Sequence, residues 1–171
     1  MTTTSASQGY RTINPATGEL LKSFDNATDQ QIADALDASQ AAYEQWSQKS
    51  VAERAAVVKR ISELLAERSK DIAALITTEM GKSLGAAVGE VRYGAQIFGY
   101  YADEAEELLA DQPIKQFSGQ EAFVQRLPIG PLLGIMPWNF PVYQVARFVA
   151  PNLVLGNTIL LKHAEINPQV A

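Results

Sequence analysis

Residues 131–141 read PLLGIMPWNFP, and the architecture of the chain can be predicted from this stretch. Leu132 to Met136 is a short apolar run bounded by prolines, which is typical of a strand buried on both faces. A helix of about 15 residues is expected after Pro141. Gly156-Asn157 is then a turn, and Thr158 to Leu161 a second buried strand. A strand, a helix and a strand in this order predict a right-handed βαβ unit with parallel strands.

The composition is that of an ordinary globular protein. Among 171 residues, 14 Lys and Arg face 19 Asp and Glu, which gives a net charge of −5. This acidic balance argues against a nucleic-acid partner, which needs clustered positive charge. The chain has no cysteine and one histidine, His163. These counts exclude a disulfide framework, a thiolate metal site and a cysteine nucleophile supplied by this chain.

The sequence predicts neither a signal peptide nor a membrane-spanning segment. The opening MTTTSASQ lacks the basic and apolar regions of a signal peptide, so we expect residues 1–9 to form a disordered tail. The most apolar stretch, Val142 to Leu155, is interrupted by polar residues and is shorter than the roughly 20 residues that span a bilayer. We therefore expect a cytoplasmic protein with no membrane partner.

Local signals predict a hairpin followed by helices in the first two thirds of the chain. Tyr10 to Ile13 and Leu20 to Phe24 flank a loop that contains Pro and Gly, which is typical of a hairpin. Two capping boxes then predict helix starts, Thr28 with Gln31 and Ser50 with Glu53. A third apolar face is expected to end at Gly81.

A longer helix is expected from Ser83 to Ala110. Its glycines each cost about 1 kcal/mol relative to alanine inside a helix, so we expect close helix packing at these positions. They are Gly85, Gly89, Gly94 and Gly99. The acidic residues near its end are expected to form a solvated face, and no metal site is predicted. They are Asp103, Glu104, Glu106, Glu107 and Asp111.

The chain divides by composition into a hairpin and helical part (10–119), a strand segment (120–130) and the βαβ unit (131–171). Within the middle segment, Phe123 to Leu127 is strand-like, and the prolines that follow break it. A parallel sheet of two strands leaves apolar faces and edges uncovered. We therefore expect this chain to be the front portion of a larger α/β protein.

Asn139 is the first candidate for chemistry, because it lies between the predicted strand and helix. In open α/β sheets, ligands bind beyond the carboxyl ends of the strands. An Asn there can direct its side-chain NH₂ at an oxyanion. The alternative is a helix N-cap, a position that Asn fills well. Spacing alone favours the cap.

Lys162 and Glu165 are the second candidate, because they follow the next strand. A carboxylate at such a strand end can accept hydrogen bonds from ribose hydroxyls, and the lysine can donate to the same group. The alternative is a surface pair near a helix start, and spacing alone favours it. No Gly-rich phosphate loop is present.

The sequence resembles the aldehyde dehydrogenase superfamily over nearly its whole length after the polar tail. The resemblance rests on Gly134 to Pro141, which contain PWNFP, and on Gly156-Asn157-Thr158 with Leu161-Lys162. Upstream elements agree in order: Asn14 to Glu19, Glu79 to Lys82, and Glu90-Val91. The resemblance implies an α/β fold with an N-terminal helical layer and the beginning of a Rossmann-like parallel sheet.

The resemblance also implies a reaction, the oxidation of an aldehyde to an acid through a cysteine thiohemiacetal and thioester. The cysteine and the general-base glutamate would lie outside this chain, which alone is expected to be inactive. Asn139 matches the donor that stabilises the oxyanion. Residues matching the cofactor site are Ile135, Met136, Pro137 and Trp138 along the cleft, and Lys162 and Glu165 at the adenosine ribose.

Arg147 and Tyr143 are candidates for binding the substrate. They lie one helical turn apart, so they share a face of the predicted helix. A guanidinium in an otherwise apolar helix can bind a carboxylate with two hydrogen bonds. Family members that act on succinate semialdehyde carry an Arg at this position, so the resemblance suggests that substrate. The alternative is a salt bridge from Arg147 to a structural carboxylate.

The expected cofactor is NAD or NADP. Glu165 should accept from a free 2′-hydroxyl and repel a 2′-phosphate, which favours NAD. Lys162 could neutralise a phosphate if Glu165 turned away, and semialdehyde relatives often use NADP. The strand at Phe123 to Leu127 matches the family's oligomerisation arm, so the resemblance implies a homodimer or homotetramer.

Two further hypotheses remain open from sequence. The chain could be a non-catalytic folding or assembly module, which the absence of cysteine fits equally well. It could also belong to a dehydrogenase for another small aldehyde acid, such as glutarate semialdehyde.

Overall fold

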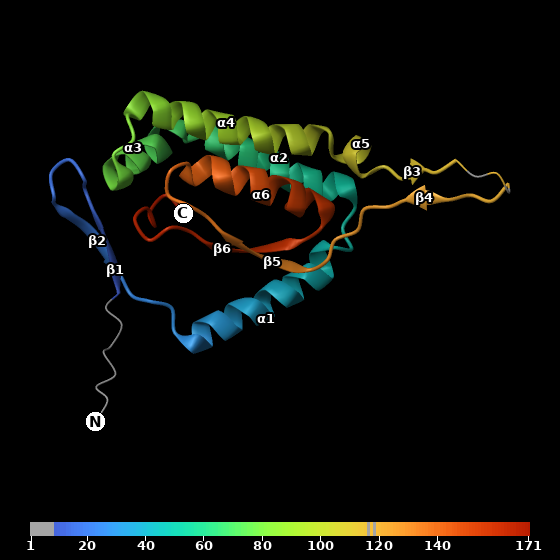
Figure 1. Ribbon diagram of the computed structural model, residues 1–171, viewed down its shortest axis with the longest axis horizontal. Coiled ribbons are helices and arrows are strands. Elements are labelled where there is room, and N and C mark those ends of the chain that lie inside the picture. The colour runs from blue at the N-terminus through green and yellow to red at the C-terminus, as the bar shows by residue number, and fades with distance from the viewer. Residues whose placement is uncertain (1–8, 116, 118) are drawn as a thin grey trace.

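The structure is a computed structural model that describes residues 9–115, 117 and 119–171 (Figure 1). The predicted tail therefore lies outside the described residues except for Gly9. In chain order the elements are β1 (Tyr10–Ile13), β2 (Leu20–Phe24), α1 (Asp29–Trp46), α2 (Val51–Glu67), α3 (Ser69–Met80), α4 (Leu84–Asp103), α5 (Ala105–Leu109), β3 (Gln112–Pro113), β4 (Phe123–Val124), β5 (Pro131–Ile135), α6 (Pro141–Leu155) and β6 (Thr158–Lys162). Among the described helices, none combines the length and apolarity needed to cross a membrane.

The local signals of the first half are confirmed. β1 and β2 form an antiparallel hairpin in which Tyr10 lies opposite Phe24. Both capping boxes are present, so α1 begins after Thr28 and α2 after Ser50. α3 ends at Gly81, whose φ of 78° is left-handed and therefore suits glycine.

The long helix predicted to reach Ala110 is interrupted near its end. α4 stops at Asp103, and Glu104 has φ and ψ of −96° and 6° before the short α5 begins. Ala105, directly after this break, is almost fully buried in a cluster with Phe98 and Ala102. The break thus places a small apolar side chain in the core. It was not predicted, because the apolar residues follow a helical period across this point.

The βαβ unit is confirmed. β5 and β6 are parallel, with Ile135 in register with Lys162, and α6 connects them. The expectation that the first strand is buried on both faces is wrong for the chain described here. Leu133 and Ile135 are 63% and 69% exposed, because α6 covers the opposite face of β5, where Gly134 lies against Phe148.

Figure 1 shows the elements as layers, with α4 and α2 over α6, α6 over the β5–β6 pair, and α1 beyond the pair. The core lies between the helices. One buried cluster joins α2, α4, α5 and α6 and comprises Val58, Phe98, Ala102, Ala105, Ala146, Ala150 and Val154. A second joins α3, α4 and α6 and comprises Ala73, Ile76, Ala87, Val91 and Val142. Helix α6 contributes to both clusters, so its position is fixed from two directions.

Close helix packing explains two of the four glycines of α4. A Cβ atom on Gly94 would lie 2.8 Å from Cγ1 of Val142 in α6, and one on Gly99 would lie 3.2 Å from Oγ of Ser62 in α2. The expectation is wrong for Gly85 and Gly89, because an added Cβ would meet no atom within 4 Å.

The strand segment after α5 forms a narrow ribbon that extends away from the helical layers (Figure 1). β4 pairs antiparallel with β3, a partner strand that the sequence did not predict. The strand is two residues long rather than the five expected from Phe123 to Leu127. In the observed register residues 125–127 would face residues 109–111, where α5 ends. β3 comes from the segment assigned by composition to the helical part (10–119).

Candidate functional site

The connection between β5 and α6 contains PWNFP and lies at the carboxyl end of the parallel strands. Its central residue, Asn139, is exposed. The predicted alternative that Asn139 caps α6 is wrong, because the N-cap residue is Phe140 and it makes no side-chain capping bond. The side chain of Asn139 is therefore not used to start the helix.

Glu90 of α4 caps α6 in place of a local residue. Its Oε1 accepts hydrogen bonds from the backbone N–H of Val142 at 2.9 Å and of Tyr143 at 3.2 Å. The first N–H groups of a helix have no partner within it, and a carboxylate also interacts favourably with the positive end of the helix dipole. A residue 52 positions away in the sequence thus fixes where α6 begins.

Lys82 links this cap to the PWNFP connection. Its Nζ forms an ion pair with Oε2 of Glu90 and donates a 2.7 Å hydrogen bond to the backbone carbonyl of Asn139. The same Nζ lies 4.0 Å from the centroid of the Phe140 ring. One ammonium group therefore contacts two consecutive residues of the connection and the carboxylate that caps the helix.

The segment after β6 holds the connection from its other side. Nε2 of His163 lies 3.0 Å from the carbonyl oxygen of Pro141, and Nδ2 of Asn167 donates to the carbonyl of Trp138 at 3.4 Å. Because a carbonyl can only accept, Nε2 of His163 must carry a proton. Asn167 is fully buried. The carbonyl groups on both sides of Asn139 are thus bound by side chains from distant parts of the chain.

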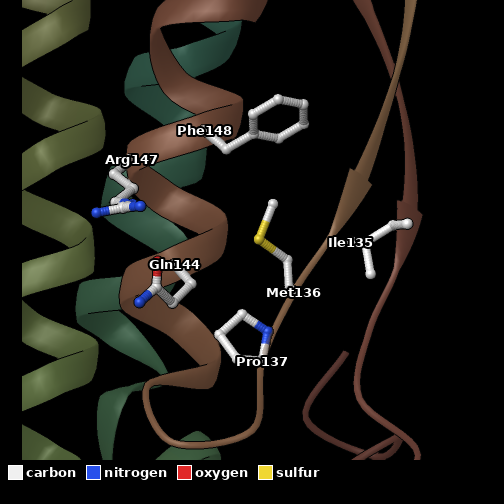
Figure 2. A pocket seen from close by; sticks show the side chains of 6 residues that line it. All are labelled: Ile135, Met136, Pro137, Gln144, Arg147 and Phe148. Carbon is white, nitrogen blue, oxygen red and sulfur yellow. The ribbon is translucent and has the colours of Figure 1, made fainter.

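A hollow of about 500 Å³ opens between β5 and α6. Its lining comprises Ile135, Met136, Pro137, Gln144, Arg147 and Phe148. Figure 2 shows Met136 pointing toward α6 and Ile135 pointing away from it. The hollow joins three predicted cofactor residues to the predicted substrate residue Arg147. Its lining does not include Asn139, Lys162 or Glu165.

Arg147 and Tyr143 are brought together as predicted. The guanidinium carbon of Arg147 lies 5.7 Å from the centroid of the Tyr143 ring, and Tyr93 of α4 stacks on the same ring with centroids 5.6 Å apart. Arg147 is exposed. The alternative of a salt bridge to a structural carboxylate is not met within the described part of the chain, where no carboxylate oxygen lies within 4 Å of its nitrogens.

Lys162 is the last residue of β6 and Glu165 follows three positions later, next to the end of β5. The N–H of Met136 donates to the carbonyl of Lys162 at 3.0 Å, so the two strand ends meet. Both side chains are exposed, and none of the ion pairs of the described residues joins them. No group of three His, Cys, Asp or Glu suited to a metal occurs among residues 9–115, 117 and 119–171.

The comparison with protein families covers almost the whole chain. Residues 2–171 match the model of the aldehyde dehydrogenase family. The chain belongs to the aldehyde dehydrogenase family. The resemblance to this family that the sequence suggested is therefore confirmed.

Curated members of the aldehyde dehydrogenase family resemble the chain closely. A succinate-semialdehyde dehydrogenase [NADP(+)] of Deinococcus radiodurans is 48% identical over 162 residues, which are 95% of this chain and 34% of that protein. Succinate-semialdehyde dehydrogenase [NADP(+)] 1 of Mycobacterium tuberculosis is 43% identical and is matched over 94% of this chain and 35% of its own length. The chain thus spans about a third of the length of these relatives.

Solved structures of aldehyde dehydrogenases share the fold. A structure of Gox0499, described as giving insights into cofactor and substrate selection, has a TM-score of 0.93 at 41% identity and matches 96% of this chain and 36% of its own. Succinic semialdehyde dehydrogenase from Streptococcus pyogenes in complex with NADP+ has a TM-score of 0.90 at 40% identity, over 95% of this chain and 36% of its own. The partial α/β fold predicted from the sequence is thereby confirmed.

No role was predicted from the sequence for Lys82, Glu90, His163 or Asn167, although the first two lie within segments that carry the family resemblance. A signal was available for Glu90, because it lies seven residues before the apolar Ile97 and so shares its face of the predicted helix. A carboxylate on such a face needs a buried partner. No comparable signal marks the partner itself, since the N–H groups of α6 are invisible in the sequence pattern.

Proposed function

We propose that this chain forms the N-terminal part of the active site of an NADP-dependent succinate-semialdehyde dehydrogenase. The proposal depends on one observation above the others, the exposed guanidinium of Arg147, which rests on Tyr143 without a carboxylate partner among the described residues. Two relatives that are 48% and 43% identical bear the name of this enzyme, which supports the same substrate. The complete protein comprises this chain and any continuation of its reading frame.

Asn139 is proposed to stabilise the transition state. Its side-chain amide is not consumed by helix capping, because Glu90 performs that task. An amide donor of this kind can bind the oxygen of the aldehyde as it becomes an oxyanion, which in related acyl chemistry contributes about 2.7–4 kcal/mol. The nucleophile must come from outside these 171 residues, which contain no cysteine.

Arg147 is proposed to bind the carboxylate at the far end of the substrate. A guanidinium offers two parallel N–H donors to a carboxylate and remains charged at neutral pH. Its guanidinium lies over the ring of Tyr143, which is itself stacked on Tyr93. A short aldehyde acid would then be held at one end by Arg147 while its carbonyl meets Asn139.

The strand ends fit a nicotinamide dinucleotide. Lys162 and Glu165 are exposed at the carboxyl edge of the parallel pair, where open α/β sheets bind such ligands, and the backbone of residues 135–138 borders the same edge. These residues would hold the ribose hydroxyls and one wall of the cofactor. When bound, the nicotinamide supplies the acceptor for the hydride that leaves the substrate.

NADP is proposed rather than NAD. Because no ion pair ties Glu165 to Lys162, the carboxylate is free to turn away and leave the ammonium to a 2′-phosphate. The relatives' names specify NADP(+), and the Streptococcus pyogenes structure contains it. These facts outweigh the electrostatic preference for NAD expected from Glu165 in the sequence.

The ribbon of β3 and β4 is proposed to mediate homo-oligomerisation in the complete protein. It carries several exposed apolar side chains, namely Ile114, Phe117, Phe123, Val124 and Leu127. A short strand pair of this kind offers edges that can pair with another copy. Light scattering on a variant that lacks residues 112–127 should give a smaller assembly than the intact protein.

The cytoplasmic location expected from the sequence also stays a proposal.

The function is tested by assaying the complete protein with succinate semialdehyde and with butanal, an aldehyde of equal carbon number without the carboxylate. We expect NADP-dependent oxidation of the first, with kcat/KM about 10- to 100-fold above that of butanal. Equal efficiency with both aldehydes would refute the substrate, and preference for glutarate semialdehyde would replace it. The 171-residue chain alone should show no turnover. If the complete protein oxidises neither aldehyde and the chain binds a partner chain, the result would favour the assembly-module hypothesis.

A further inference from the structure

We propose that Lys82 and Glu90 form a positioning pair that fixes the backbone of Asn139 and thereby the direction of its amide. The proposal rests on the proposed function in that Asn139 is taken to act on the substrate. Neither residue touches the substrate in this scheme; both act through the PWNFP connection. The pair therefore consists of positioning residues rather than catalytic ones.

Glu90 fixes the start of α6. Its side chain is only 2% exposed, and its two oxygens divide their work. Oε1 accepts from the N–H groups of Val142 and Tyr143, while Oε2 faces Nζ of Lys82. Because Asn139 is separated from these amides by only two and three residues, the carboxylate limits how far the connection can shift relative to α4.

Lys82 fixes the peptide plane that follows Asn139. Its side chain is 13% exposed, so its ammonium is largely withdrawn from water. It donates to the Asn139 carbonyl at 2.7 Å and lies 4.0 Å from the centre of the Phe140 ring, so it contacts both residues that share this peptide group. Holding that plane restricts ψ of Asn139 and φ of Phe140. Only the side-chain torsions of Asn139 then remain to be set.

Stability alone does not explain why a buried ion pair is found at the start of this helix. A Ser, Thr or Asp at the N-cap would satisfy the same N–H groups locally, and buried ion pairs often add little to stability over apolar replacements. What the pair does provide is a fixed geometry between α4, α6 and the connection. This geometry is useful where a donor must meet a developing charge, since misplacement by about 1 Å can cost about 100-fold in rate.

The test uses the complete protein with Lys82→Met, Lys82→Arg and Glu90→Gln, and Lys59→Met as the control. Lys59 forms an exposed ion pair with Asp103, the last residue of α4, whereas Glu90 lies near the beginning of that helix. We expect Lys82→Met and Glu90→Gln to lower kcat about 10- to 100-fold. KM for NADP should change less than about threefold, Lys82→Arg should recover most of the rate, and Lys59→Met should behave as wild type.

A double-mutant cycle with Asn139→Ala separates positioning from a general structural effect. If Lys82 acts through Asn139, adding Lys82→Met to Asn139→Ala should lower kcat by less than about threefold further. Fully additive losses would overturn the proposal, and so would an unchanged kcat in both Lys82→Met and Glu90→Gln.

Hydrogen exchange gives a readout that does not need activity. Peptides spanning residues 138–143 should exchange faster in Lys82→Met and Glu90→Gln than in wild type or Lys59→Met, and unchanged exchange would overturn the proposal. A wild-type protein that oxidises no aldehyde would refute the proposed function instead, and exchange would then decide the positioning role alone. If Lys82→Met fails to fold, Glu90→Gln, which keeps the shape of the side chain, decides both readouts.

Discussion

The guanidinium carbon of Arg147 lies 5.7 Å from the centroid of the Tyr143 ring, one helical turn earlier on α6. A cation over an aromatic face gains about 0.5–1 kcal/mol at an exposed site, which is enough to favour one orientation of the side chain but does not neutralise its charge. Tyr93 stacks on the same ring and joins this arrangement to α4. Arg147 is thus oriented while its hydrogen-bond donors stay available to a ligand.

Replacing Arg147 with alanine should alter substrate choice in the complete protein. Because a charge-assisted hydrogen-bonded contact would be lost, kcat/KM for succinate semialdehyde should fall about 10- to 100-fold, while that for butanal should change by less than about twofold. The control is Arg60→Ala, which removes an exposed arginine paired with Glu63 and Glu67 on α2. Equal losses for both aldehydes would show that Arg147 does not bind the carboxylate.

Glu165→Gln should favour NADP further. Removing a negative charge near a 2′-phosphate relieves repulsion of about 1 kcal/mol, so KM for NADP should fall up to about fivefold while KM for NAD falls little or rises. Lys162→Met should raise KM for NADP more than for NAD. Steady-state kinetics with both cofactors measure this, and Glu63→Gln on α2 is the control. A lower KM for NAD in the wild-type protein would contradict the choice of NADP.

The capping box of α2 should make stability depend on pH. The pKa of Glu53 lies below its ordinary value of 4.5, chiefly because its carboxylate accepts from the Ser50 hydroxyl, then from the Ser50 N–H, with Lys49 adding a favourable charge. A lowered pKa in the folded state stabilises the fold above the unfolded value and loses that contribution as the pH falls through the folded value.

Glu53→Gln tests this dependence by urea unfolding at about pH 7 and at about pH 3.5. The variant should be less stable than wild type at the higher pH, and the difference should shrink at the lower pH, because stabilisation from a lowered pKa is lost as the pH falls through the folded value. Glu44→Gln on α1 should show a smaller change. A difference between variant and wild type that grows in acid would have the wrong sign.

Asn157→Ala should destabilise the fold substantially. Asn157 is 1% exposed, and its Oδ1 accepts from the N–H of Ile129 at 2.7 Å and of Gly130 at 3.1 Å. Buried donors left without a partner cost about 1–3 kcal/mol, so we expect a loss of about 2–3 kcal/mol in urea unfolding. Asn14→Ala in the exposed β1–β2 loop, whose side chain accepts one N–H, should cost about 1 kcal/mol or less. Similar costs at both sites would contradict the role of burial.

Features specified by neighbouring residues were predictable from the sequence. The capping boxes at Thr28 and Ser50 and the stop at Gly81 are local patterns, and each appears in the structure as expected. The βαβ unit was predictable because its strands and helix differ in period and are separated by Pro and Gly. The prediction of a right-handed connection between parallel strands follows from the general preference of βαβ units and from no single residue.

Features that need a partner far along the chain were not predictable. The position of Glu90 on an apolar face indicated a buried partner, but the partner itself was not predictable, since its hydrogen bonds go to backbone groups of α6. β3 contains only Gln112 and Pro113, too short for any periodic signal. Asn139 lies between a strand and a helix as predicted, but it does not cap the helix, because the side chain of the distant Glu90 does so. The stacking of Tyr93 on Tyr143 likewise depends on helix packing.

The capping of α6 by Glu90 also bears on how the molecule acquires its shape. An excised peptide of residues 141–155 would lack its N-terminal acceptor and would nucleate poorly, because helix initiation is costly and short isolated helices are marginal in water. α6 gains that acceptor only when α4 packs against it, so formation of its first turn is coupled to tertiary packing. Asn139, the proposed oxyanion donor, would accordingly reach its position only together with the docking of α4 and α6.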